Sequence, residues 1–370
     1  MFARVSTYGI AIAALLMTAC SQNETELNTA SQEPVAISFS FTPAQDNQAT
    51  TRGEAENAQL RNTGFGVFAT VAGSEIPNLM YNQKVTYTYL ADDNYLDENG
   101  QLTSEAENGY WSYSPVKYWP MTVDGAGNTV PQNVTFCAYA PYAEPNANGN
   151  TGATFGITEI STNAQAPYLI YKRYTNPKDS VNLLWDCQVP NTPGSINLRM
   201  RHALARVAVS IKLEHAPADG KKVLLNRVTL SGNIAESGKL NLAVAGETPT
   251  WIEHDTKEIT IYTDCDPEKN TDSWGLINND IRYVKDLPYN WQPAGLNATN
   301  YQNVITIDGH VGYLYLIPQA NLTLNCSVAY TILSSDGSPA VTDEKVHIDK
   351  VVASPLNGST PYNLQLRLNL

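Results

Sequence analysis

The residue best placed to do chemistry is Cys20, which ends an apolar stretch near the start of the chain. Arg4 precedes that stretch, Ile10 to Met17 are all apolar, and the chain turns polar directly after Cys20. This is the layout of a secretory signal, and the run is too short to stay in a bilayer as a spanning helix. A thiol at the cleavage point can accept a diacylglycerol, and the freed amine can accept a third acyl chain. We therefore predict a signal peptide over residues 1–19 and lipidation of Cys20.

The residues Thr18-Ala19-Cys20 resemble a bacterial lipobox, with Met17 at the position where that motif prefers leucine. An ordinary signal peptide with an incidental cysteine is the alternative. Two or more acyl chains hold a protein firmly at a membrane, whereas one chain binds only marginally. Lipidation thus predicts an outer-membrane lipoprotein whose polar tether spans residues 20–33. The tether's Glu24 and Glu26 fit a solvated linker or a signal for export to the cell surface.

The composition favours an exported β-protein. The chain has 370 residues, of which 16% are charged, and its net charge is -13. An acidic surface does not suit nucleic acid, because phosphate binding needs basic residues. Short runs in which apolar and polar residues alternate, separated by Gly, Pro and Asn, predict mostly antiparallel strands. The length suggests about two domains.

Four cysteines follow Cys20, and their spacing does not resemble a metal site. Four cysteines allow three pairings in an oxidising compartment, and buried free thiols are equally compatible with the sequence. Both states stay open for Cys137, Cys187, Cys265 and Cys326.

The sequence carries no recognisable catalytic or metal-binding motif. Its five histidines are scattered, and we interpret His202, beside an apolar run, as structural. The acidic segment 92–100 only superficially resembles a calcium loop, since Leu96 and Asp97 break the required spacing. A pair of carboxylates for glycoside hydrolysis could still form in space. We predict no cofactor, no metal and no enzymatic activity.

The first strand and the loop after it form a second candidate site. Val35, Ile37, Phe39 and Phe41 alternate with small or polar residues, which predicts a strand with four apolar side chains on one face. Residues 42–63 are polar and carry Arg52-Gly53 and Arg61. Exposed loops of this length are where proteases cut, although a simple connection is the plainer interpretation.

Four short motifs then occur in order. They are Trp111 with Lys117-Tyr118-Trp119-Pro120, Phe136-Cys137-Ala138-Tyr139-Ala140-Pro141-Tyr142, Leu183-Leu184, and His202-Ala203-Leu204-Ala205-Arg206-Val207. The aromatic residues among them could line a glycan-binding face, but they more often pack a sandwich core. Together, and behind a lipobox, the motifs resemble the fimbrillins of Bacteroidota, the subunits of lipoprotein-derived (type V) pili. Cys137 stands where the family usually has another apolar residue.

The resemblance implies an all-β chain of two tandem transthyretin-like β-sandwich domains, over residues 34–190 and 195–370. Two prolines and a glycine make 187–195 the candidate linker. Asp179-Ser180-Val181 matches a short O-glycosylation pattern of exported proteins in that phylum, which marks Ser180. The resemblance also implies that a trypsin-like protease cuts after Arg52, with Arg61 as the second choice. Cutting would free the strand that starts at Val35, and a strand of another subunit would replace it.

Further alternating runs fill the second half of the chain. The last one places Tyr362, Leu364, Leu366, Leu368 and Leu370 on one face, a pattern that fits either a donor strand for a neighbour or the last strand of its own domain. The other predicted strands cover 205–213, 223–230, 239–244, 258–262, 304–307, 313–317 and 321–333.

Three functions are compatible with these features. The favoured one is a structural and adhesive pilus subunit on the cell surface, whose partners are other pilus subunits, the membrane through its lipid anchor, and a host or bacterial surface ligand. The alternatives are a surface lipoprotein that binds glycans without polymerising, and a secreted carbohydrate-active enzyme.

Overall fold

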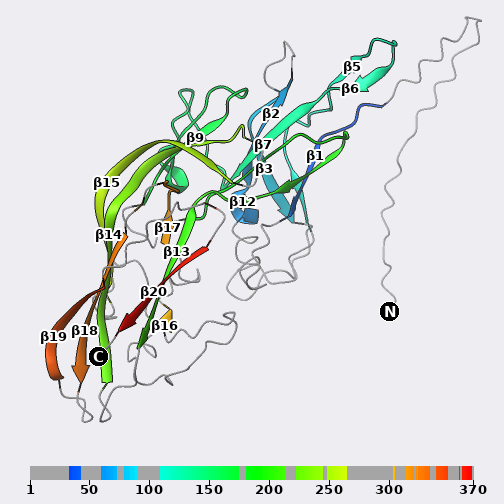
Figure 1. Cartoon of the computed structure of the whole chain (residues 1–370). Coiled ribbons are helices and arrows are strands. Elements are labelled where there is room, and N and C mark those ends of the chain that lie inside the picture. Colours follow the sequence, from blue (N-terminus) through cyan, green and yellow to red (C-terminus); the bar gives the residue numbers. More distant parts are fainter. Residues whose placement is uncertain are drawn as a thin grey trace, which may run out of the picture. The chain divides into compact units, whose positions relative to one another are not determined.

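The computed structural model describes residues 33–42, 60–72, 79–89, 109–174, 181–213, 222–244, 248–264, 303–304, 314–320, 322, 324–333, 339–348, 358 and 361–368. The chain divides into Met1–Pro34 and one compact unit, Val35–Leu370. Strands dominate the described ranges (Figure 1), which confirms the predicted all-β class. No helix within these ranges is long and apolar enough to cross a membrane. Several predicted features lie outside them: the signal peptide, Cys20, Arg52-Gly53, segment 92–100, Ser180, Cys265 and Leu370.

The first half of the chain builds a six-stranded sheet of order β12-β10-β7-β2-β3-β4, a two-stranded parallel sheet and a hairpin. The large sheet contains β2 (Phe65–Val71), β3 (Met80–Tyr89), β4 (Gly109–Ser112), β7 (Val134–Ala140), β10 (Leu184–Gln188) and β12 (Arg201–His202). The parallel pair is β1 (Ser38–Thr42) and β11 (Ser195–Arg199), and the hairpin is β5 (Met121–Val123) and β6 (Thr129–Pro131).

The remaining strands build two further sheets. One is centred on β13 (Ala205–Leu213), which pairs with β16 (Asn303–Val304), β17 (Leu314–Leu316) and β20 (Pro361–Leu368). The other is centred on β14 (Lys222–Asn241) and contains β8 (Ile157–Ile160), β9 (Tyr168–Lys172), β15 (Thr250–Asp264), β18 (Leu324–Leu333) and β19 (Pro339–Ile348). A 3-10 turn, Thr154–Gly156, precedes β8.

β14 differs from the sequence prediction, which divided it into two strands at 223–230 and 239–244. The structure has one strand of 20 residues. Its pairing with β15 shifts register between Ala235 and Ser237 and again between Ser237 and Lys239. Such bulges let a long strand bend without ending. They also interrupt the alternation of apolar and polar residues, which is why the sequence predicts two strands.

The six-stranded sheet is apolar on both faces. Val67, Phe136 and Ala138 belong to one core cluster, together with residues of β1 and β11. Phe68, Cys137 and Tyr139 belong to a second cluster, which also takes in side chains of β8, β9, β14 and β17. The sheet is therefore covered on one side by the β1–β11 pair and on the other by side chains of β8, β9, β14 and β17.

The predicted boundary at 187–195 coincides with a break in the strands but not with a break in pairing. Residues 189–194 form no strand, while Cys187 and Gln188 still belong to β10 and Ser195 begins β11. β11 pairs with β1, and β9 pairs with β14, so strand pairing crosses the boundary in both directions. The division into 34–190 and 195–370 stays a prediction.

Candidate functional site

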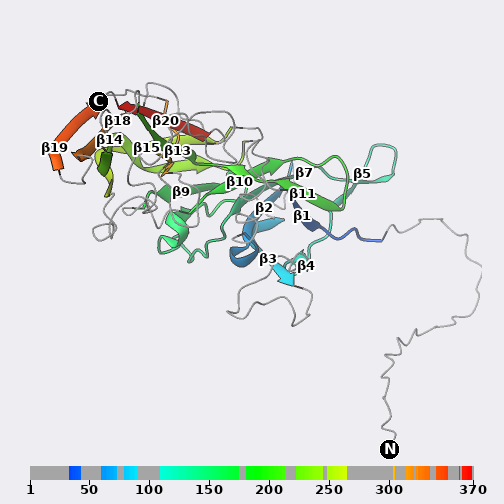
Figure 2. The same cartoon turned by 90° about the horizontal axis from the view of Figure 1, so that it is seen from below.

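The strand β1 is held by segments that are far away in the sequence. It pairs in parallel with β11 (Figure 2), in a register that places Ser38 opposite Ser195 and Phe41 opposite Leu198. The sequence predicts a strand that begins at Val35, whereas β1 begins at Ser38.

The residues just before β1 are bound by the segment 113–119. The Ile37 N–H donates to the Lys117 carbonyl over 2.9 Å, and the Trp119 N–H donates to the Val35 carbonyl over 2.8 Å. Residues 35–37 are thus bonded to segment 113–119 and residues 38–42 to β11, and we call the place that residues 35–42 occupy the recess.

Two side chains fill this recess, where the sequence predicts four. Ile37 and Phe39 are buried, at 2% and 5% exposure, and Phe41 is half-buried against the same cluster. Val35 is 40% exposed, because it lies before the strand and outside the cluster. Full burial of Ile37 and Phe39 is worth about 3–6 kcal/mol gross, at about 1.5–3 kcal/mol each.

The ring of Phe39 lies at the centre of an aromatic group. Its centroid is 5.5 Å from that of Tyr113, 6.0 Å from Phe65 and 6.1 Å from Phe136. The Tyr113 hydroxyl also donates to the Ile37 carbonyl over 2.8 Å. Burial raises the pKa of Tyr113, so its hydroxyl keeps the proton needed for this bond at neutral pH. The aromatic residues here serve as packing, as the sequence favours.

Phe39→Ala is expected to destabilise the protein by about 3–5 kcal/mol, because it leaves a cavity among three aromatic rings. Val35→Ala, at an exposed position shortly before β1, is the control and should change stability by less than about 0.5 kcal/mol. Urea unfolding followed by tryptophan fluorescence measures both. Equal losses in the two variants would mean that the recess does not hold Phe39 as described.

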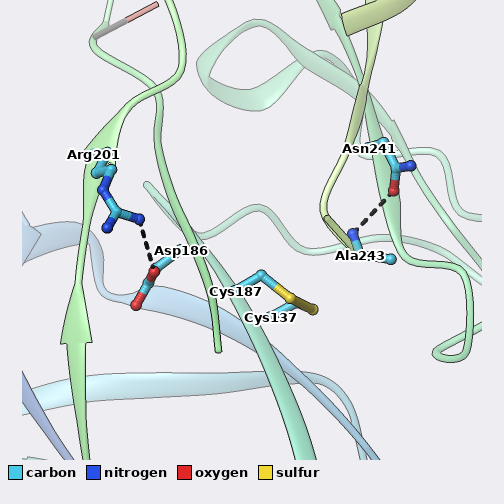
Figure 3. Close-up of a disulfide and its surroundings, with 6 residues drawn as sticks. All are labelled: Cys137, Asp186, Cys187, Arg201, Asn241 and Ala243. Atoms are coloured by element: carbon cyan, nitrogen blue, oxygen red, sulfur yellow. Dashed lines mark hydrogen bonds and ion pairs between the residues drawn. A yellow bond between two sulfur atoms is a disulfide. The ribbon is translucent and has the colours of Figure 1, made fainter. Parts of the chain in front are cut away.

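β11 is itself fastened by side chains of β10. The buried carboxylate of Asp186 accepts a hydrogen bond from the Arg199 N–H over 2.9 Å and lies 3.5 Å from the Arg201 guanidinium (Figure 3). The amide of Gln188 donates to the Asn197 carbonyl over 2.8 Å. The pattern of the sequence predicts no role for Asp186 or Gln188, although an isolated carboxylate directly after the apolar residues 183–185 is a usable signal.

Burial raises the pKa of Asp186 above its ordinary value of 3.8, against the opposing effects of Arg199 and Arg201. The folded state then holds this proton more tightly than the unfolded state. Stability from this group is present below the ordinary carboxyl pKa and is lost as the pH rises through the folded value. Asp186→Asn should abolish this decline, which urea unfolding at a series of pH values from about 3.5 upward can detect. Parallel declines in both proteins would contradict the assignment.

Cys137 and Cys187 form a disulfide between directly opposite residues of β7 and β10 (Figure 3). Of the two states left open for these cysteines, the structure contains the bonded one. Cys326 lies in β18, but its side chain is outside the described part.

Arg61, the second choice for cleavage, lies in a helical turn over residues 60–63. The turn is fixed by buried Leu60, whose carbonyl accepts the Gly64 N–H over 2.8 Å. The Arg61 guanidinium lies over the ring of Tyr87, 4.9 Å from its centroid. Exposed loop tips are the preferred sites of proteolysis, so we expect the bond after Arg61 to be cut less readily than a bond in an exposed loop.

The C-terminal strand is paired within the chain. β20 runs parallel to β13, with Tyr362 opposite Val207 and Leu368 opposite Leu213. β20 is thus paired within its own chain, and its role as a donor strand stays a prediction.

The described residues contain no cluster of three metal-binding side chains. His202 is buried, and its Nδ1 lies 2.7 Å from the side-chain amide of Asn182, in agreement with a structural role.

Comparison with known proteins finds a match only among solved structures. No protein-family model and no curated protein matches the sequence. A fimbrial protein from Bacteroides vulgatus aligns with a TM-score of 0.51 and 19% identity, over 90% of this chain and 96% of that one. The chain shares the fold of that fimbrial protein. A candidate cell adhesion protein from Bacteroides uniformis aligns with a TM-score of 0.46 and 14% identity, over 91% of this chain and 94% of that one.

Proposed function

We propose that this protein is a fimbrillin, a structural and adhesive subunit of a pilus on the bacterial surface. It would be anchored through lipid on Cys20 and would polymerise when a protease releases β1 and a strand from another copy takes its place. The observation that carries this proposal is the pairing of β1. Among the described residues, β1 has only one partner strand, β11. The protein would act without catalysis.

The sequence between β1 and the helical turn supports cleavage at one bond. From residue 43 to residue 59, Arg52 is the only lysine or arginine. The next basic residue, Arg61, lies in the helical turn described above. A protease that cuts after basic residues would therefore separate β1 from the body of the protein at Arg52-Gly53.

The disulfide supports an extracellular location. Disulfides persist in oxidising compartments such as the periplasm and the cell surface and are rare in the cytosol. The bond between Cys137 and Cys187 thus agrees with the secretory signal at the N-terminus.

The C-terminal strand is our candidate donor. It carries large apolar residues at every second position from Tyr362 to Leu370, and the recess requires two such residues at the positions of Ile37 and Phe39. It also forms a parallel pair with β13, as β1 does with β11. To act as a donor it would leave β13 and add to β11 of a neighbour.

The test compares the wild-type protein with a truncation that lacks residues 362–370. After treatment with a trypsin-like protease, wild type should form SDS-resistant ladders and the truncation should not. Ladders from the truncated protein would reject the donor. Glycan binding without filaments, in a glycan array and by electron microscopy of cells, would favour the non-polymerising lipoprotein.

A further inference from the structure

Asp186, Cys187 and Gln188 of β10 connect β11, which borders the recess, to the six-stranded sheet. The side chains of Asp186 and Gln188 hold β11 through the Arg199 N–H and the Asn197 carbonyl. Between them, Cys187 is bonded to Cys137 of β7 (Figure 3). The residues that fasten β11 are therefore next to a covalent link.

This part of β10 has a strand on one side only. β12 pairs with Leu184 and Trp185 and goes no further. Within the described ranges, residues 186–188 pair with β7 alone. A strand end with one partner opens more easily than a strand in the middle of a sheet, and the disulfide joins the central pair of that end.

The disulfide is separated from β1 by the sheet itself. Cys137 and Cys187 belong to the cluster on the face turned toward β8, β9 and β14. Ile37 and Phe39 belong to the cluster on the opposite face. Removal of β1 therefore takes Ile37 and Phe39 away from one face of the six-stranded sheet. The packing around the disulfide, on the opposite face, stays in place.

We propose that the Cys137–Cys187 disulfide keeps β11 in position after β1 has left, so that the recess retains its shape for a strand of a second copy of this chain. The inference rests on the proposed strand exchange. β11 then loses its only strand partner among the described residues and is held by Asp186, by Gln188 and by the packing of its buried Ile196 and Leu198. The disulfide fixes these two residues to β7.

The test uses the full chain with the recognition sequence of a site-specific protease in place of residues 49–55. Cys137→Ala with Cys187→Val removes the bond and keeps apolar side chains, and Cys326→Ala is the control. After cutting, a labelled peptide of residues 33–42 should exchange into wild type and the control. It should bind the double variant about tenfold or more weakly, because part of the binding free energy would then be used to put β11 back in position. Equal binding in all three proteins would overturn the inference.

Hydrogen exchange of the uncut proteins separates this inference from the proposed function. If the cut wild type takes up no peptide, the proposed strand exchange is wrong. The role of the disulfide in holding β11 is still tested by the exchange rates of the backbone amides of residues 196–199. These amides should exchange faster in the double variant than in wild type. Unchanged rates would show that the disulfide does not hold β11. If the double variant does not fold, Cys187→Val alone serves instead, because it removes the disulfide with a single substitution. Unchanged exchange at 196–199 in that variant would also overturn the inference.

Discussion

Arg52→Ala should remain uncut and monomeric under protease treatment that converts the wild-type protein into polymers. The intact chain holds β1 next to its recess at an effective concentration on the order of millimolar, which a strand from a neighbour cannot match. Burial of Ile37 and Phe39 adds about 3–6 kcal/mol gross to the resident strand. Mass spectrometry of the products and SDS gels without heating would measure cleavage and assembly.

Arg61→Ala is the matched control, because it removes the neighbouring arginine and leaves Arg52. It should be cut and should polymerise like wild type. Polymers from Arg52→Ala at the wild-type rate would reject cleavage at this bond. Loss of polymers only in Arg61→Ala would move the site to the helical turn.

Cys20→Ala should abolish lipidation, with no palmitate incorporated and the protein lost from the membrane fraction. No other residue near the predicted cleavage point has a thiol that can accept a diacylglycerol. Metabolic labelling with palmitate and fractionation of cells measure both effects. Ser21→Ala, next to the thiol, is the control and should be labelled normally. Palmitate in the Cys20→Ala protein would reject the assignment.

The sequence predicted strands well where one face is buried and the other is exposed. The run from Val35 to Phe41 shows this alternation, with Ile37 and Phe39 buried between exposed neighbours, whereas β11 alternates in the same way but was not predicted as a strand. It gave less information about β7, where both faces are buried and the pattern is nearly continuous. The all-β class could thus be predicted from the pattern within single strands. The way in which the sheets pack on one another could not.

The composition of the site was harder to predict, because it depends on contacts between distant segments. Nothing near Val35 indicates that the strand ladder begins only at Ser38, since that depends on β11. The role of Asp186 depends on Arg199 and Arg201, and the pairing of Cys137 with Cys187 depends on the register of β7 and β10. Alternation specifies a strand but not its partner.

The parallel pairing of β1 with β11 has a consequence for the order in which the chain folds. Paired residues such as Ser40 and Asn197 are 157 positions apart, so β1 leaves the ribosome and enters any export channel long before its partner. Contacts with such long sequence separation form late and slowly. Ile37 and Phe39 must therefore stay unpaired during much of the transit, which makes β1 a segment that a holding chaperone would recognise.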